Sequence, residues 1–223
     1  NAFAGTHTPA SATAAIIAAF NQRTLGSKDA SAANRHFLAD KSAIGVPFSP
    51  IAKEALYPIV ATKAEGANLW DVDGNRYVDI LMGMGINLFG HNPHFIRSAI
   101  EEQLAKGFAI GPQSELAGET AELFCRLTGK ERVTFSNTGT EAVMTAIRIA
   151  RAATGRRKIA IFAGSYHGHA DQVLNKPAGP TDLRAVPAFP GVTDTTARDV
   201  LLLDYANPQS LDILRKRGRH LAA

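Results

Sequence analysis

Apolar residues recur at helical spacing over several stretches of the chain, with polar residues between them. A helix over residues 93–106 is predicted because Phe95, Ile96, Ile100 and Leu104 fall on one face. The same spacing predicts further helices, and glycines that follow two of them mark their ends. These further predicted helices span Ala12–Arg23, Ser114–Thr128, Thr140–Thr154 and Asn207–Arg217.

Short apolar runs predict strands in the second half of the chain. Residues 158–163 are almost continuously apolar, as buried parallel strands are. Residues 132–136 and 200–205 are predicted to form two further strands. The order strand, helix, strand, loop, strand, helix predicts an α/β fold with a mainly parallel sheet. Residues 175–192 are rich in Pro and Gly and are predicted to form a long loop. Three strands make an incomplete sheet, and the last helix has no strand to return to, so we expect an interrupted fold.

A β-hairpin is predicted in the first half of the chain. The strands are residues 68–71 and 76–80, joined by the turn sequence Asp73-Gly74-Asn75. The segment after it, residues 81–91, carries three glycines. They indicate either a close backbone approach or a winding loop, and both interpretations stay open.

The N-terminal region has a weaker pattern. Residues 1–30 are rich in Ala, Ser and Thr, and apart from the short helix they are predicted to be a linker or docking segment. Pro47 and Pro50 predict an extended path through residues 31–56. We therefore divide the chain into a linker or docking segment (1–44), a segment with the hairpin (45–92) and an incomplete α/β domain (93–223).

Composition narrows the class of protein. The chain has 223 residues, of which 45% are hydrophobic and 20% charged, as in ordinary globular proteins. The basic run Arg215–His220 has no interleaved aromatics, so a solvated helix end is preferred over a nucleic-acid surface. The single Cys125 excludes an internal disulfide and favours a reducing compartment, the cytoplasm. The apolar run Ala14–Phe20 is too short to span a membrane.

The segment Ser136–Ala142 lies where a predicted strand turns into a helix. Thr138, Gly139 and Thr140 offer backbone N–H groups and hydroxyls at the positive end of that helix. Gly139 lets an anion approach the backbone without a Cβ in the way. The same residues also fit an ordinary helix cap, so the motif alone predicts either a phosphate site or a cap.

Tyr166, His167 and Gly168 follow the next strand. An aromatic ring beside a phosphate cradle can stack on a flat heterocycle, whereas the alternative is a packed tyrosine and a hydrogen-bonded histidine. His167 and His169 alternate as metal ligands can, but no third ligand has a suitable spacing, so no metal is predicted. Phosphate and ring together point to pyridoxal phosphate.

The chain resembles class III pyridoxal-phosphate-dependent aminotransferases, and among them the branch of glutamate-1-semialdehyde aminomutase. The resemblance runs from about Gly45 to the C-terminus and rests on motifs in the family's order: Trp70–Asn75, Gly90-His91, Ser136–Ala142, Ala146–Arg151 and Gly164–Asp171. It implies a partial large domain of the fold type I transferases, preceded by part of the small N-terminal domain. It also implies a homodimer.

This resemblance implies a role for each matching residue of the cofactor site. Thr138, Gly139 and Thr140 would hold the phosphate, and Tyr166 would stack on the cofactor ring with His167 beside it.

A finer resemblance concerns the substrate. Residues 55–60 and 82–91 are similar to aminotransferase domains of polyketide and peptide synthases, which serve antibiotic biosynthesis. Gly83, Met84 and Gly85 would line the substrate pocket, and the semialdehyde aminomutases carry Ser and Trp in place of Gly83 and Met84. The change implies a roomier, more apolar pocket, which favours a larger carbonyl substrate or one tethered to an acyl carrier protein.

The lysine that binds the cofactor in this family, and the aspartate that pairs with the pyridine nitrogen, lie on later segments with no match here. Lys130, Lys158 and Lys176 do not match that position. We therefore assign no catalytic residue and expect the chain to be the N-terminal half of an enzyme, inactive alone.

The expected parent activity moves an amino group from an amino acid to a ketone or aldehyde. A carrier-bound β-ketoacyl thioester is the first candidate acceptor, a long-chain aldehyde the second, and an aminomutase reaction the third. Two other classes stay open: a non-catalytic binding or assembly domain, and a nucleotide-binding domain. The chain lacks the glycine-rich motifs that are typical of nucleotide-binding domains, which argues against the second of these classes.

Overall fold

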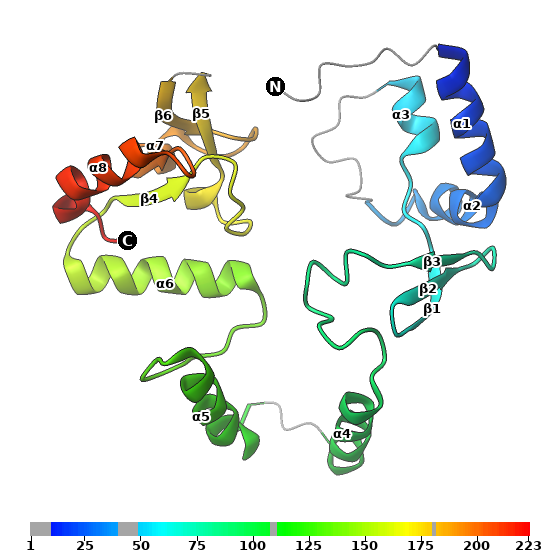
Figure 1. Cartoon of the computed structure of the whole chain (residues 1–223), viewed down its shortest axis with the longest axis horizontal. Helices are drawn as coiled ribbons and strands as arrows, with labels where there is room; N and C mark the ends of the chain where they lie inside the picture. Colours follow the sequence, from blue (N-terminus) through cyan, green and yellow to red (C-terminus); the bar gives the residue numbers. More distant parts are fainter. Residues whose placement is uncertain (1–9, 40–48, 108–110, 180–181) are drawn as a thin grey trace. The chain divides into compact units, whose positions relative to one another are not determined.

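A computed structural model describes residues 10–39, 49–107, 111–179 and 182–223. The chain divides into two compact units, Asn1–Pro112 and Gln113–Ala223, and each is described by itself (Figure 1). The second unit begins at Gln113, within residues 93–223, which the sequence pattern assigns to one incomplete α/β domain.

The first unit begins with helices where a linker was predicted. Helix α1 spans Ala10–Arg23, as expected, but α2 (Leu25–Asn34) and α3 (Pro50–Ala55) were not foreseen. Instead of starting an extended path, Pro50 opens α3, where its fixed backbone angle and missing N–H are tolerated. The Ser49 hydroxyl oxygen caps this helix by accepting from the Ala52 amide at 3.0 Å. The other part of the expected extended path, residues 40–48, lies outside the described residues.

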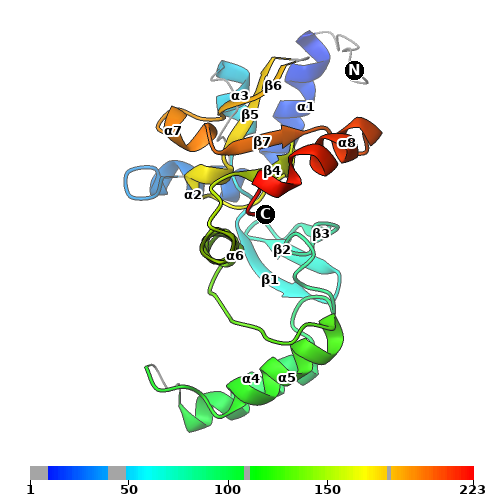
Figure 2. The same cartoon turned by 90° about the vertical axis from the view of Figure 1, so that its left-hand side faces the viewer.

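A three-stranded antiparallel sheet follows, with β1 (Ala61–Glu65), β2 (Asn68–Asp71) and β3 (Arg76–Val78) in that order (Figure 2). The predicted hairpin is confirmed as β2–β3, whereas β1 was missed. The sequence Ala-Thr-Lys-Ala-Glu has few of the β-branched or aromatic residues that indicate a strand.

The carboxylate of Asp71 holds the hairpin turn. It is buried and accepts hydrogen bonds from the amides of Asp73 and Asn75, at 3.0 and 2.8 Å, and from the Asn75 side chain and the Tyr77 hydroxyl, at 2.9 and 2.7 Å. Burial raises the pKa of Asp71, but these hydrogen bonds outweigh it and keep the pKa below its ordinary value.

The N-terminal helices are hydrogen-bonded to the segment that leads into β1 and to the turn between β2 and β3. Thr24 and Ser27 are both buried. The Thr24 hydroxyl lies 2.7 Å from the Tyr57 hydroxyl, and the Ser27 hydroxyl accepts from the Val60 amide at 3.0 Å. The Asp73 carboxylate accepts from the Gly26 amide at 2.7 Å. Residues 10–34 are therefore packed structure within this unit. The unit ends with the predicted helix, α4 (His94–Lys106).

The second unit contains α5 (Leu116–Thr128) and α6 (Gly139–Thr154), both predicted. Each ends at a glycine, Gly129 or Gly155, in the left-handed conformation. A four-stranded sheet follows in the order β4-β7-β6-β5, with α7 (Asp194–Ala197) and α8 (Pro208–Arg217). Its strands are β4 (Ile159–Phe162), β5 (Asn175–Gly179), β6 (Asp182–Pro187) and β7 (Val200–Leu203).

This sheet is mixed rather than mainly parallel. Strands β4 and β7 are parallel, but β6 is antiparallel to both β7 and β5. The predicted long loop is wrong where β5 and β6 form a hairpin. Pro177 disfavours a strand in general, but proline is tolerated in a strand at the edge of a sheet, which is where β5 lies.

Two other expectations fail in this unit. Residues 132–136 do not form a strand, because none of the described strands pairs with them. Contrary to expectation, the chain after α8 does return to the sheet: Leu221 is buried and forms a parallel bridge with Lys158, next to β4.

The core of the second unit joins α6 to the parallel strands. Buried Ile147 of α6 packs with Ile159 and Ile161 of β4 and with Val200 and Leu202 of β7. Helix α6 covers one face of the sheet, and α7 and α8 lie on the other (Figures 1 and 2). Among the residues that the structure describes, no helix combines the length and the apolar character needed to cross a membrane.

The hydrogen bond between Tyr77 and Asp71 predicts that the stability of the chain changes at alkaline pH. Burial and the neighbouring Asp71 carboxylate raise the pKa of Tyr77 to about 12. An unfolded tyrosine titrates at about 10, so between these values the folded chain binds more protons and its free energy of unfolding falls as the pH rises. We expect the stability advantage of the wild type over Tyr77→Phe to be present below about pH 10 and to shrink above it. Urea unfolding of both proteins across this range measures the difference in their free energies of unfolding. A difference that does not vary with pH would contradict the raised pKa of Tyr77.

Candidate cofactor and substrate sites

The N-terminus of α6 is built by a capping box. Thr138 is the N-cap and its hydroxyl oxygen accepts from the Glu141 amide at 3.2 Å, while the Glu141 carboxylate accepts from the Thr138 amide at 3.0 Å. These bonds use two of the amides at the helix start. The amides of Gly139 and Thr140 stay at the positive end of a 16-residue helix, where an anion is stabilised.

Space for an anion is available at this helix end. A Cβ added to Gly139 would meet no heavy atom within 4 Å. The hydroxyl oxygens of Thr138 and Thr140 both accept a hydrogen bond from a backbone amide, which leaves each hydroxyl hydrogen free to donate. The motif is therefore a helix cap and can be an anion site as well, because the two uses do not compete for the same atoms.

The loop after β4 lies directly against this helix end. The His169 amide donates to the Thr140 hydroxyl oxygen at 3.0 Å. Gly168 has a φ of +99°, and a Cβ there would lie 2.7 Å from the Thr140 hydroxyl oxygen and 2.9 Å from the Thr140 Cα. Tyr166 and His167 belong to the same short loop. The structure thus brings together the two motifs that the sequence predicts to bind the cofactor.

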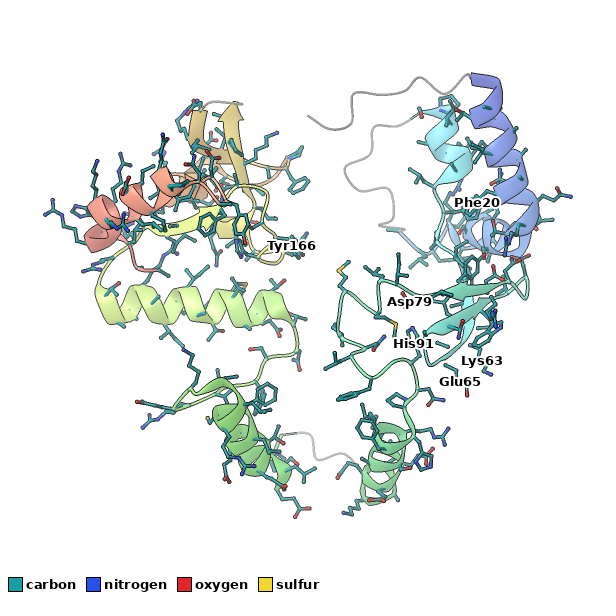
Figure 3. All side chains as sticks on the ribbon, viewed as in Figure 1. Phe20, Lys63, Glu65, Asp79, His91 and Tyr166 are labelled. Atoms are coloured by element: carbon teal, nitrogen blue, oxygen red, sulfur yellow. The ribbon has the colours of Figure 1, made fainter. Side chains whose placement is uncertain are left out.

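Two aromatic side chains stand exposed at this edge of the sheet. Tyr166 is 77% exposed, so it is not the packed core tyrosine of the alternative interpretation (Figure 3). Tyr205 follows β7, is 78% exposed and contacts the Phe162 ring edge-on at 5.7 Å between centroids. Because β4 and β7 are parallel, their carboxyl ends meet at one edge. Tyr205 was missed, although its position directly after a parallel strand was a usable signal.

His167 carries a buried nitrogen that needs a partner. Its Nε2 atom is buried and has no hydrogen-bond partner among the described residues. Such an atom costs free energy unless a polar group meets it. The helix end and the exposed tyrosine ring fit a phosphorylated, flat heterocycle.

The predicted substrate residues lie in the first unit, whereas the predicted cofactor residues lie in the second. Gly83, Met84 and Gly85 have φ values of +63°, +60° and +88°, so the segment winds as a left-handed turn. The Met84 side chain is 84% exposed. Gly90, in contrast, permits a close backbone approach, the other interpretation of these glycines. A Cβ there would lie 2.9 Å from the Gly66 carbonyl oxygen.

The second unit thus has a helix end suited to an anion, with exposed aromatic rings at the same edge of its sheet, as a site for a phosphorylated planar cofactor requires. Residues 50–213 match the family "Aminotransferase class-III". The chain belongs to this family, which indicates pyridoxal phosphate as the cofactor, in agreement with the sequence analysis.

Individual relatives agree with this membership. The chain is 42% identical over 175 residues to a glutamate-1-semialdehyde 2,1-aminomutase of Deinococcus radiodurans, covering 74% of this chain and 39% of the relative. An omega-transaminase from Sphaerobacter thermophilus superposes with a TM-score of 0.76 at 29% identity, over 88% of this chain and 46% of that one. A transaminase with PLP bound superposes with a TM-score of 0.77 at 30% identity, over 90% and 46%.

The chain thus spans less than half the length of these relatives. What it shares with them is the fold type I architecture over most of its own length, as the sequence predicts.

The contact between Gly168 and Thr140 makes a second prediction. We expect Gly168→Ala to lower the free energy of unfolding by about 2 kcal/mol or more, because the new methyl group meets the helix backbone and the residue keeps a positive φ. Gly164→Ala is the matched control, since Gly164 has a φ of +81° in the same loop but no heavy atom within 4 Å of an added Cβ. Urea unfolding followed by circular dichroism measures both, and equal losses would show that the contact with Thr140 contributes nothing.

Proposed function

We propose that this chain forms the cofactor-binding part of a pyridoxal-phosphate-dependent aminotransferase. The enzyme would move an amino group from an amino acid to a ketone or aldehyde. The observation that carries the proposal is the hydrogen bond from the His169 amide to the Thr140 hydroxyl oxygen. It joins a helix end suited to phosphate to a loop that presents an exposed aromatic ring.

Each residue of the cofactor site has a proposed task. The amides of Gly139 and Thr140 and the hydroxyls of Thr138 and Thr140 would bind the phosphate. Tyr166 would cover one face of the ring, and His167 Nε2 would meet a polar group at its edge. When bound, the cofactor supplies an electron sink for amino-group transfer. The chain's own residues bind it, orient it and exclude water from one face of its ring.

A separate part of the proposal concerns the molecule that accepts the amino group. Gly83, Met84 and Gly85 would line the substrate pocket, and Met84 offers a flexible apolar surface. A carrier-bound β-ketoacyl thioester, supplied by an acyl carrier protein in polyketide or antibiotic biosynthesis, is our first candidate. A homodimer in the cytoplasm, typical of the family, completes this proposal.

A second candidate is an aminomutase acting on glutamate-1-semialdehyde. The identity of 42% to a relative of that name favours it. Against it stand Gly83 and Met84, which give a pocket without the polar and aromatic groups expected for a small semialdehyde. The full-length parent enzyme, loaded with the amine form of the cofactor, distinguishes the two candidates. The true acceptor converts the cofactor to its aldehyde form, and absorbance follows this conversion.

Cofactor binding by this chain is the direct test of the site. Pyridoxamine phosphate is the suitable probe, because its amine cannot react with lysine side chains. We expect it to bind at least about tenfold more tightly than pyridoxamine, since only the phosphate engages the helix end. Titration calorimetry measures both affinities, and equal affinities would contradict the phosphate site.

The aromatic contact has its own matched pair of variants. Tyr166→Ala should weaken binding of pyridoxamine phosphate roughly three- to tenfold by removing the stacked ring. Tyr166→Phe keeps the ring and should bind within about twofold of the wild type. An equal loss in both variants would indicate a role for the hydroxyl instead of stacking.

A further inference from the structure

The loop that carries Gly83, Met84 and Gly85 has an unusual backbone. Four consecutive residues, Met82 to Gly85, have positive φ values, from +47° to +88°. Two of the four are methionines, for which this conformation costs free energy that glycine does not incur. A run of this kind persists only where the surrounding structure holds it, and strained backbone often accompanies functional sites.

The Asp79 carboxylate holds the start of this turn. Asp79 follows β3, and one of its oxygens accepts hydrogen bonds from the amides of Leu81 and Met82, both at 2.9 Å. Further on, the Asn87 amide donates to the Met82 carbonyl oxygen at 3.0 Å. The turn is thus hydrogen-bonded on both sides of its strained residues.

The second oxygen of Asp79 reaches the end of the loop. It lies 2.7 Å from His91 Nε2, and the Asn87 side-chain amide lies 3.3 Å from His91 Nδ1. Because the amide nitrogen of Asn87 can only donate, Nδ1 accepts and the proton resides on Nε2, facing the carboxylate. The amide of Met82 and the side chain of His91 both lower the pKa of Asp79, which keeps it ionised.

His91 itself is fixed to the β1–β2 turn. Its amide donates to the Gly66 carbonyl oxygen at 2.8 Å, and the Gly66 amide donates to the His91 carbonyl oxygen at 3.0 Å. The lack of a Cβ at Gly90 permits this approach. Asp79 therefore links the strained turn, through His91, to the β1–β2 turn.

A second pair of a carboxylate and a basic side chain in the same unit is much more exposed than Asp79 and His91. Lys63 and Glu65 are 2.8 Å apart, with side chains 61% and 60% exposed, whereas the side chains of His91 and Asp79 are 18% and 13% exposed (Figure 3). Glu65 accepts no backbone amide among the described hydrogen bonds. It thus provides a control carboxylate for Asp79.

We propose that Asp79, His91 and Asn87 are positioning residues that hold Met82–Gly85 in its left-handed turn, and so fix the backbone position from which the Met84 side chain extends. This inference rests on the proposed function in one respect: the turn lines the substrate pocket only if that proposal is right. The positioning role itself concerns the loop alone, and its test needs neither cofactor nor activity.

Amide hydrogen exchange of the full chain tests the proposal residue by residue. Asp79→Asn preserves the shape of the side chain but removes its charge, and an amide can accept at only one of its two ends. We expect exchange of residues 81–87 to rise about tenfold or more, while exchange of the β2–β3 hairpin changes less than about twofold. Glu65→Gln, the same chemical change at the exposed pair, should alter neither.

Two substitutions of His91 complete the test. His91→Gln places an amide donor near the position of Nε2 and should keep exchange of the turn within about threefold of the wild type. His91→Leu removes the donor and should behave like Asp79→Asn.

Unchanged exchange of the turn in Asp79→Asn would overturn the proposal. An equal rise in the turn and the hairpin would also overturn it, because Asp79 would then stabilise the whole unit. Failure of pyridoxamine phosphate to bind would instead contradict the proposed function and leave these exchange results standing.

Discussion

The contact between Thr140 and the loop at Gly168 and His169 is the constraint on which the candidate cofactor site depends. One backbone amide and one hydroxyl oxygen join the start of α6 to the loop after β4 at 3.0 Å. Only glycine fits at residue 168, because any Cβ would meet the helix backbone. The core beneath, where Ile147 packs on both parallel strands, keeps helix and strand in this arrangement. The packing of this core therefore keeps the residues proposed to bind the phosphate next to the loop that carries Tyr166.

The first unit twice uses a carboxylate at the end of a strand to organise the turn that follows. Asp71 ends β2 and binds the amides of Asp73 and Asn75, and Asp79 follows β3 and binds the amides of Leu81 and Met82. In both cases the second oxygen reaches a more distant side chain, Tyr77 or His91. A short acidic side chain is suited to this task, because it can accept several hydrogen bonds from the backbone next to it.

Local signals predicted most helices correctly and failed where pairing decided the outcome. The helices that start at Leu116 and Gly139 end at glycines, which the sequence marks directly. The β5–β6 hairpin was predicted as a loop because Pro177 disfavours a strand, and only its place at the sheet edge makes the proline acceptable. Residues 132–136 have a strand-like pattern but no described strand pairs with them. The helix α2 was missed because its composition resembles a linker, and its burial comes from contacts of Thr24 and Ser27 with distant residues.

The sequence by itself determined the class of protein and the chemistry of its candidate site. The motif Ser136–Ala142 and the residues around Tyr166 predicted a phosphate cradle and an aromatic partner, because helix caps and strand ends are local properties of the chain. Only the tertiary structure decided that the Thr140 hydroxyl accepts from the loop and that His167 Nε2 is buried without a partner among the described residues. It also decided that Asp79 joins the strained turn to His91. These features depend on contacts between residues far apart in the chain, which follow from packing and not from local propensity.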